Sequence, residues 1–324
     1  MFKATIEGMK GLTDIPGVKV GHASDFEALT GCTVVLCEKG AVAGYDIRGG
    51  ATGTEEMDVM SPAHITSHVH AVVLAGGSAF GLEAASGVRR FLEQKGIGFP
   101  TGAAVVPIVP CAILYDLGIG KASVRPTREM GESAAAAATD AAVREGCVGA
   151  GTGATVGKAL GMKSAMKGGV GSFTVALPGG VLVSALVAVN AVGDVLDPKS
   201  GKILAGARKS EAESGFANSV ELMKRRGATG GLRKNTTLAV VATNARLTKV
   251  EATRIAQLSH HGFVRSIAPV HTSMDGDLCI ALSCGDLAAS PDAVGVAAGE
   301  AVAEAIVRAV KAAKTMGGVP GLAG

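Results

Sequence analysis

The sequence predicts a protein of the α/β or α+β class, in which helices cover the faces of β-sheets. Apolar stretches rich in Val, Leu and Ile alternate along the chain with Ala-rich stretches of helical spacing. The chain has 324 residues, of which 47 are Gly, and it is 48% hydrophobic but only 3% aromatic. We therefore expect a core of Ala, Val, Leu and Ile, with backbones that approach each other closely at glycines.

Six stretches have the composition of β-strands and are bounded by Gly, Pro, Asn or Asp. In chain order they are residues 31–37, 71–75, 103–109, 180–192, 237–243 and 278–283. Four stretches have apolar residues at helical spacing, and these are 81–94, 130–144, 249–260 and 291–313. The last helix has a start signal at Ser290 and Pro291, with Asp292 in its first turn.

Charge and cysteine content exclude several classes of function. The net charge is +3, from 31 basic and 28 acidic residues without a run of one sign, so we expect neither nucleic acid nor a membrane surface as a partner. No uninterrupted apolar stretch of about 18 residues predicts a membrane span, and the N-terminus lacks the apolar core of a signal peptide. The six cysteines are dispersed, which predicts buried free thiols and a cytoplasmic location.

Nucleotide and metal sites are weakly indicated. Residues 151–158 resemble a phosphate loop, but Thr152 and Ala159 stand where that motif needs Gly and a hydroxyl residue. The glycine-rich residues 75–81 lack the spacing of a dinucleotide-binding motif. His64 and His68 have the i, i+4 spacing of a zinc motif without its helical HExxH context. We therefore expect no cofactor and no metal.

The candidate nucleophile lies at the junction of Asn235 and Thr236. Here a charged, Gly-rich stretch, residues 197–235, leads into an apolar strand, and we expect that stretch to be a solvated linker. If the junction is cut, Thr236 gains an α-amine beside its hydroxyl, and an amine of usual pKa about 7.7–8.0 is a general base near neutral pH. On local sequence alone, a Thr that opens a strand is equally ordinary.

Short motifs spread over nearly the whole chain favour the interpretation of this junction as a cleavage site. They are residues 11–22, 48–54, 76–82, 113–117, 153–158, 187–194, 235–237 and 271–277. In this order they resemble the self-processing N-terminal-nucleophile peptidases and amidases. That family includes the L-aminopeptidase/D-esterase, the β-peptidyl aminopeptidases and the nylon-oligomer hydrolase.

The resemblance implies a fold and a maturation step. The fold is an αββα four-layer sandwich, formed by residues 1–324 as a single domain. Cleavage between Asn235 and Thr236 yields fragments 1–235 and 236–324. The fragments stay associated because the second supplies core strands and the long helix, and homo-oligomers of the processed pair are usual in the family.

The resemblance also assigns the residues of acyl transfer. Thr236 matches the nucleophile, and Asn190 matches a residue whose amide helps to form the oxyanion hole. Tyr115 matches a pocket tyrosine near the reacting carbonyl. An Asn amide aimed at a developing oxyanion is worth about 2.7–4 kcal/mol, so these roles are chemically reasonable. From the residues alone, Asn190 interrupts an apolar strand, where Asn is unfavourable, whereas Tyr115 also fits a core tyrosine.

A cluster of charged residues completes the expected site. Lys158 matches a lysine beside the nucleophile of the nylon-oligomer hydrolase, and Asp275 and Asp277 match the polar pair that orients and tunes the nucleophile. A lysine there partly neutralises the carboxylates and favours a neutral amine on Thr236. The aminopeptidases have Ser and Glu where this chain has the two Asp, so it is more similar to the nylon-oligomer hydrolase at this point. Taken alone, Asp-Gly-Asp is a common turn, and Lys158 fits a solvated lysine.

The expected activity is hydrolysis of the amide bonds of peptides or small amides through an acyl-enzyme. Endo-type hydrolysis of ω-amino-acid oligomers at the same site is an alternative. A transferase similar to ornithine acetyltransferase is a second alternative, although that enzyme's Ala-Thr-Met-Leu cleavage motif is absent. A non-enzymatic binding protein that stays uncleaved is the third.

Overall fold

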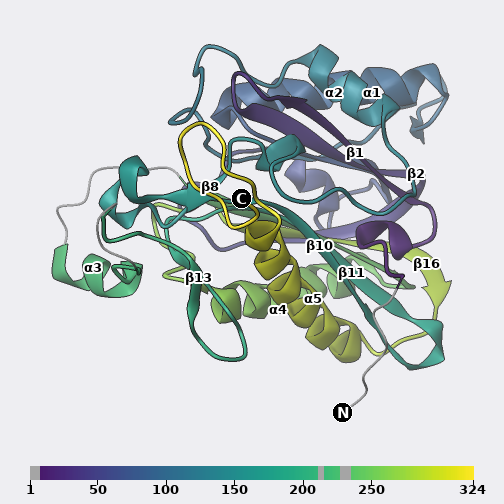
Figure 1. The fold of residues 1–324 in the computed structure, drawn as a ribbon. Coiled ribbons are helices and arrows are strands. Elements are labelled where there is room, and N and C mark those ends of the chain that lie inside the picture. The colour runs from purple at the N-terminus through teal and green to yellow at the C-terminus, as the bar shows by residue number, and fades with distance from the viewer. Residues whose placement is uncertain (1–7, 211–214, 227–234) are drawn as a thin grey trace.

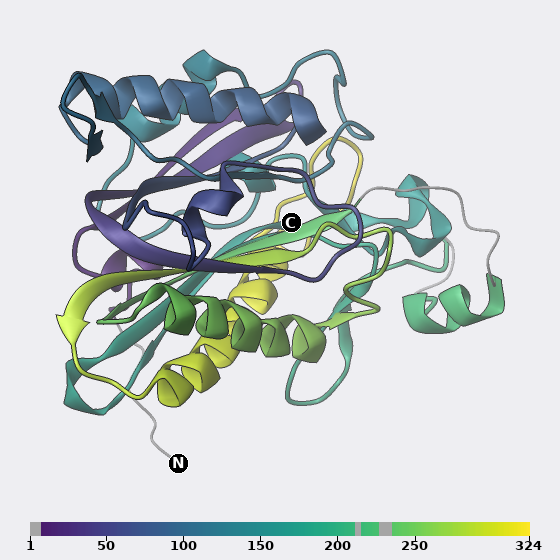
Figure 2. The same ribbon diagram turned by 180° about the vertical axis from the view of Figure 1, so that it is seen from behind.

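Two β-sheets lie between two pairs of helices in the computed structural model, which describes residues 8–210, 215–226 and 235–324 (Figures 1 and 2). One outer layer contains α1 (Ala84–Gln94) and α2 (Arg128–Ala136). The opposite outer layer contains α4 (Lys249–Ser266) and α5 (Pro291–Lys311). The short helix α3 (Ser219–Arg226) lies to one side of these layers (Figure 1).

The two sheets are joined through one long strand. Among the described residues, nine strands are hydrogen-bonded in the order β10-β11-β14-β16-β2-β4-β7-β3, with β1 paired to β2. These strands are β1 (Val18–Asp25), β2 (Thr30–Ile47), β3 (Thr54–Glu55), β4 (Val69–Ala75), β7 (Cys111–Ile113), β10 (Gly169–Ala176), β11 (Leu182–Asn190), β14 (Thr236–Ala245) and β16 (Leu278–Leu287). The first half of β2 pairs with β4 and its second half with β16, so this strand belongs to both layers.

Short strands and 3₁₀ turns complete the structure. The short strands are β5 (Phe99–Pro100), β6 (Val105–Val106), β8 (Thr155–Val156), β9 (Met166–Lys167), β12 (Asp194–Leu196), β13 (Ile203–Ala205) and β15 (Ile267–Ala268). The 3₁₀ turns are Leu12–Asp14, Met57–Met60, Ser78–Glu83, Gly149–Gly151, Lys158–Leu160, Met162–Ser164 and Pro178–Gly180.

Three hydrophobic cores separate the four layers, because successive side chains of a strand point to opposite faces. On β14, Ala239 and Val241 pack toward α4 and α5, whereas Leu238 and Val240 pack between the two sheets. The third core lies between the other sheet and the helices α1 and α2. This arrangement confirms the predicted α/β class and its αββα layers.

Most predicted elements occur, with two corrections. The helix expected over 130–144 ends at Ala136, because Thr139 exchanges backbone hydrogen bonds with Val20 of the edge strand β1 (2.9 and 3.1 Å). The strand expected over 103–109 is limited to the two residues of β6, since the next residue, Pro107, has no N–H to donate to a ladder.

The stretch predicted as a solvated linker contains regular secondary structure. It contains β13 and α3, and its residues 211–214 and 227–234 lie outside the described residues. Its last residue differs from the prediction of a solvated segment, because Asn235 is only 1% exposed and the adjacent Thr236 only 2%. Strand pairing on both sides explains this burial.

The cysteines and helices agree with the composition. All six cysteines lie in the described ranges, and none forms a disulfide; five are buried and Cys284 is half-buried. No helix in those ranges is both long enough and apolar enough to cross a bilayer.

Candidate active site

Thr236 and Asn190 face each other at the ends of two neighbouring strands. Thr236 begins β14 and Asn190 ends β11, and the two residues are direct partners in the antiparallel ladder. Leu238 and Ala188, two residues further along their strands, pack between the sheets. Because side chains alternate, Thr236 and Asn190 also point into the layer between the sheets. Both are almost fully buried, at 2% and 0% exposure.

The carbonyl group of Asn235 is held by two hydrogen-bond donors. It accepts a bond of 2.6 Å from the Thr236 hydroxyl and one of 2.7 Å from the N–H of Gly276. The N–H of Asn235 donates to the carbonyl of Met274 at 2.9 Å, which fixes the peptide beside the segment that precedes β16. The hydroxyl therefore lies directly beside the peptide bond that precedes it, and a backbone N–H polarises the carbonyl of that bond.

Two buried carboxylates flank this peptide. Asp275 accepts bonds from the Thr272 hydroxyl (2.6 Å) and the Val192 N–H (3.3 Å). Asp277 accepts a bond of 2.7 Å from the N–H of Thr237, the residue after the candidate nucleophile. Burial, and after it the negative charge of Asp277, raises the pKa of Asp275 to about 6. Asp275 therefore changes its charge close to neutral pH.

Lys158 is a buried cation at the same site. Its Nζ donates to the Oδ1 of Asn190 at 2.8 Å and to the carbonyl of Asn190 at 3.0 Å. Burial lowers the pKa of Lys158 to about 7, although the attraction of Asp275 acts in the opposite direction. The lysine therefore holds Asn190 in place and brings a charge that is lost readily near neutral pH.

The Asn190 amide links the lysine to the tyrosine. Its Oδ1 also accepts a bond of 3.0 Å from the N–H of Thr155, and its Nδ2 donates to the backbone carbonyl of Tyr115 at 3.0 Å. In this structure Tyr115 thus contacts Asn190 through its backbone carbonyl, which accepts a hydrogen bond from the Asn190 amide.

The structure brings all six predicted residues into one contiguous site. Asn190 contacts Thr236, Lys158 and Tyr115, and the segment with Asp275 and Asp277 pairs with Asn235 and Thr237. Their catalytic roles remain predictions.

Sequence reasoning missed three residues of this site. Gly276 was seen only as a spacer between two carboxylates, yet it donates to the Asn235 carbonyl, and a Cβ there would lie 2.7 Å from the Thr236 hydroxyl. His271 and His260 received no role, although His271 stands 3.0 Å from Asp277 and contacts His260. The position of His271 in the 271–277 motif was the available signal. His260 comes from α4, and nothing in the linear sequence connects it with the motif.

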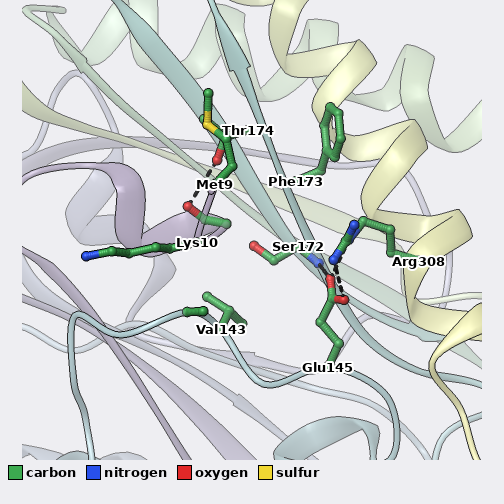
Figure 3. A pocket seen from close by; sticks show the side chains of 10 residues that line it. Met9, Lys10, Val143, Glu145, Ser172, Phe173, Thr174 and Arg308 are labelled. Carbon is green, nitrogen blue, oxygen red and sulfur yellow. Dashed lines mark hydrogen bonds and ion pairs between the residues drawn. The ribbon is translucent and has the colours of Figure 1, made fainter. Parts of the chain in front are cut away.

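A separate hollow of about 110 Å³ lies at the outer edge of β10. It is lined in part by Ser172, Glu145 and Arg308, and Figure 3 shows the ion pair of the last two closing one side. Ser172 pairs with Leu186, which is four residues, or roughly 13 Å of strand, from Asn190. The hollow is therefore distinct from the site around Thr236. Across the described residues, no three His, Cys, Asp or Glu side chains are grouped to hold a metal ion.

Comparison with known proteins identifies the family of this chain. The sequence matches the family model described as Peptidase family S58 over residues 10–323. The chain belongs to Peptidase family S58. It is a hydrolase that acts on peptide or amide bonds.

Two relatives illustrate the range of this family. An uncharacterised aminopeptidase of Mycobacterium leprae (strain TN) is 39% identical, and the match covers 96% of this chain and 93% of the relative. A 6-aminohexanoate-oligomer endohydrolase of Kocuria sp. (strain KY2) is 31% identical, over 92% of this chain and 85% of the relative.

Solved structures confirm the fold. A β-aminopeptidase of Burkholderia sp. superimposes with a TM-score of 0.69 at 23% identity, and covers 97% of this chain and 90% of the other. The L-aminopeptidase D-Ala-esterase/amidase of Ochrobactrum anthropi, described as a variant of the Ntn hydrolase fold, has a TM-score of 0.70 at 20% identity, over 96% and 88% of the chains. This S58-family chain therefore has the fold of N-terminal-nucleophile hydrolases.

Proposed function

We propose that the chain cleaves its own Asn235–Thr236 bond and that the exposed Thr236 then hydrolyses amide bonds. One observation carries the proposal: the Thr236 hydroxyl lies 2.6 Å from the carbonyl oxygen of Asn235, and the Gly276 N–H binds the same oxygen at 2.7 Å. A nucleophile and an oxyanion donor thus converge on one buried peptide bond. Nothing about an ordinary strand start requires this convergence.

Self-cleavage proceeds through an ester. The Thr236 oxygen adds to the Asn235 carbonyl carbon, so a C–O bond forms, the peptide C–N bond breaks, and the hydroxyl proton passes to the nitrogen. Water then attacks the ester, gives its hydroxyl to the new Asn235 carboxyl group and returns a proton to the Thr236 oxygen. The Gly276 N–H stabilises the negative charge that develops on the carbonyl oxygen, a contribution of about 2.7–4 kcal/mol in comparable sites.

Substrate hydrolysis uses the amine that cleavage creates. The α-amine of Thr236 takes the hydroxyl proton as the oxygen attacks the substrate carbonyl, and it passes this proton to the leaving nitrogen as the C–N bond breaks and an acyl-enzyme forms. Water then hydrolyses this ester, giving its hydroxyl to the released acid and a proton to the Thr236 oxygen. The positive charge of Lys158 and the burial of the site favour the neutral form of this amine, which is the form able to act as a base. Asn190 and Tyr115 are proposed to contact the oxyanion once the preceding segment has left. Asp275 and Asp277 hold the backbone on either side.

The relatives and the carboxylate pair support two proposals for the substrate class. Peptides or small amides are our first proposal, because the relatives of 39% identity are named aminopeptidases. Oligomers of ω-amino acids are the second, favoured by the 31% identical oligomer endohydrolases together with Asp275 and Asp277. A homo-oligomer of processed pairs and a cytoplasmic location remain predictions for this chain.

The first experiment is the intact mass of the denatured protein beside a Thr236→Ala control. The proposal expects two fragments that meet between Asn235 and Thr236, and a control that keeps the full mass of 32.1 kDa. A wild-type chain that stays full-length after long incubation contradicts it. Processed protein is then assayed with amino-acid anilides and with 6-aminohexanoate oligomers. Hydrolysis of one set and not the other selects between the two substrate classes.

A further inference from the structure

A line of hydrogen-bonded side chains runs from the candidate site to the second half of β2. Asp277 Oδ2 lies 3.0 Å from His271 Nδ1, and His271 Nε2 lies 3.2 Å from His260 Nδ1. His260 Nε2 in turn lies 3.2 Å from the backbone carbonyl of Asp46. The other oxygen of Asp277 accepts the N–H of Thr237. The line therefore ends one residue from the proposed nucleophile.

This line needs a fixed number of protons. Each of its three contacts joins atoms that bond only if one of the two carries a hydrogen, and the Asp46 carbonyl is an acceptor only. Three satisfied contacts thus require three protons, shared among the Asp277 carboxylate and the rings of His271 and His260. Two neutral imidazoles supply only two. The third proton gives this set of three groups a net charge of zero, so that a carboxylate is balanced by one imidazolium.

The extra proton belongs on His271. Burial, and after it the proximity of His271, lowers the pKa of His260 to about 4, so His260 is neutral. Because the Asp46 carbonyl requires a hydrogen on His260 Nε2, His260 Nδ1 must accept from His271 Nε2. The remaining proton lies between Asp277 and the other nitrogen of His271. Because a carboxyl group is ordinarily a stronger acid than an imidazolium, this proton is placed on His271 Nδ1, which donates to Asp277. This arrangement satisfies every contact with one imidazolium beside one carboxylate.

Backbone conformation and ring packing fix the position of His271. Its φ is +57°, a left-handed conformation that is unfavourable for a non-glycine residue, and its backbone N–H donates to the same Asp277 oxygen at 3.0 Å. Phe263 of α4 packs against both imidazoles, with ring centroids 4.9 Å from His260 and 5.5 Å from His271.

Charged groups face this set from several elements. The Asp46 carboxylate lies 3.4 Å from His260 Nε2, and Arg48 pairs with Asp46. On the side of the proposed nucleophile, Asp275 and Lys158 complete the charges around Asp277.

We propose that His271 and His260 are positioning residues that hold Asp277, and through the Thr237 N–H also Thr236, in a geometry that requires their shared third proton. The kinetic part of this inference rests on the function proposed above. When the pH rises and the third proton is lost, one contact of the line must break and Asp277 is released from its fixed orientation. The rates of self-cleavage and of hydrolysis then fall on the alkaline side.

Two substitutions of His260 separate this role from simple packing. His260→Gln can accept from His271 Nε2 and donate to the Asp46 carbonyl, so it preserves the requirement for a protonated His271. His260→Phe fills similar space but removes two contacts, after which a neutral His271 satisfies Asp277. The expected result is an alkaline decline of about tenfold per pH unit in wild type and His260→Gln, and none in His260→Phe.

His22 offers a matched control. It is a half-buried histidine, with a pKa lowered to about 4 mainly by loss of solvation, and it bonds Thr33 on β2 at 2.9 Å. His22→Phe should keep the wild-type pH profile of hydrolysis. The inference is overturned if His260→Phe retains the alkaline decline, or if His22→Phe loses it equally.

A direct reading of the protons does not depend on activity. Nitrogen NMR of ¹⁵N-histidine in the uncleaved Thr236→Ala chain should show both His271 ring nitrogens protonated at pH 7, and His260 neutral with its proton on Nε2. A neutral His271 would overturn the inference even if wild type cleaves itself and hydrolyses amides. A protonated His271 in Thr236→Ala, together with a wild-type chain that never cleaves itself, would instead leave the proton assignment standing and contradict the proposed function.

Discussion

Replacing Gly276 by Ala tests the geometry of self-cleavage most directly. A Cβ at this position would lie 2.7 Å from the Thr236 hydroxyl and 2.8 Å from the carbonyl of Ala51. Ordinary contacts begin at 3.4 Å, so the hydroxyl must retreat by about 0.7 Å, the difference between 3.4 and 2.7 Å, unless the Gly276 backbone moves instead. Either movement disturbs the pairing of the nucleophile with the carbonyl it attacks.

The expected loss of rate follows from that displacement. A misplacement of about 1 Å costs roughly 10²-fold in rate, and loss of an oxyanion donor costs a comparable factor, so we expect Gly276→Ala to slow self-cleavage by about 10-fold to 100-fold. The strain on the surrounding backbone should also lower the free energy of unfolding by about 1–3 kcal/mol. The assay is a time course of intact mass after synthesis of the chain.

A matched control separates this effect from a general sensitivity to glycine replacement. A Cβ at Gly118 meets nothing within 4 Å, and its backbone is not in the left-handed region, so Gly118→Ala should be cleaved at the wild-type rate. Cleavage of folded Gly276→Ala at the wild-type rate would refute the argument, because it would mean that the placement of the Thr236 hydroxyl beside Asn235 does not limit the reaction.

Three further substitutions test the charges of the protein. Asp275 has its pKa raised from 3.8 to about 6 by folding, so its contribution to stability is full below 3.8 and is lost as the pH rises through 6. In a cleavage-deficient background, lowering the pH from 8 to 5 should therefore raise the free energy of unfolding of the parent by about 1.4 kcal/mol more than that of Asp275→Asn, as measured by urea unfolding. An equal pH dependence of the two proteins would contradict this. Lys158→Met removes the cation that stabilises ionised Asp275, so the acid limb of the pH–rate profile for hydrolysis should move to higher pH by about one unit, and an unmoved limb would exclude the coupling. Glu145→Gln removes the charge of a carboxylate that accepts hydrogen bonds from the Ser172 N–H at 2.8 Å and twice from Arg308 at 2.7 Å. Thermal unfolding should therefore show a free energy of unfolding lower by about 1–2 kcal/mol, with the rate of self-cleavage unchanged.

The general architecture was predictable because buried strands and helices have apolar residues at regular spacing in the sequence. The strand after Thr236 and the helix after Pro291 are long, apolar and bounded by turn residues, and both were found within two residues of their ends. The predictions failed where tertiary hydrogen bonds overrule local preference. The Ala-rich residues after Ala136 leave the helix because Thr139 pairs with a strand that is more than 100 residues earlier in the chain.

The candidate site was only partly predictable, for a different reason. Thr236, Asn190 and the carboxylate pair stand in recognisable motifs, so resemblance located them. The contacts that give them chemistry join segments distant in sequence: Lys158 reaches Asn190 across 32 residues, and His260 reaches the carbonyl of Asp46 across 214. The role of Gly276 comes from a backbone N–H, which no side-chain pattern records.

The strand order has a consequence for how this protein returns from the unfolded state. The strands β14 and β16 lie next to each other, between β11 on one side and β2 on the other, and the proposed cut separates the middle two from both neighbours. An intact chain regains this order in a unimolecular reaction. After cleavage, unfolding of the sheet is still a first-order process, whereas refolding requires the two separate fragments to associate. Its refolding would then depend on concentration, and protein diluted after full denaturation would recover far less than the uncleaved precursor.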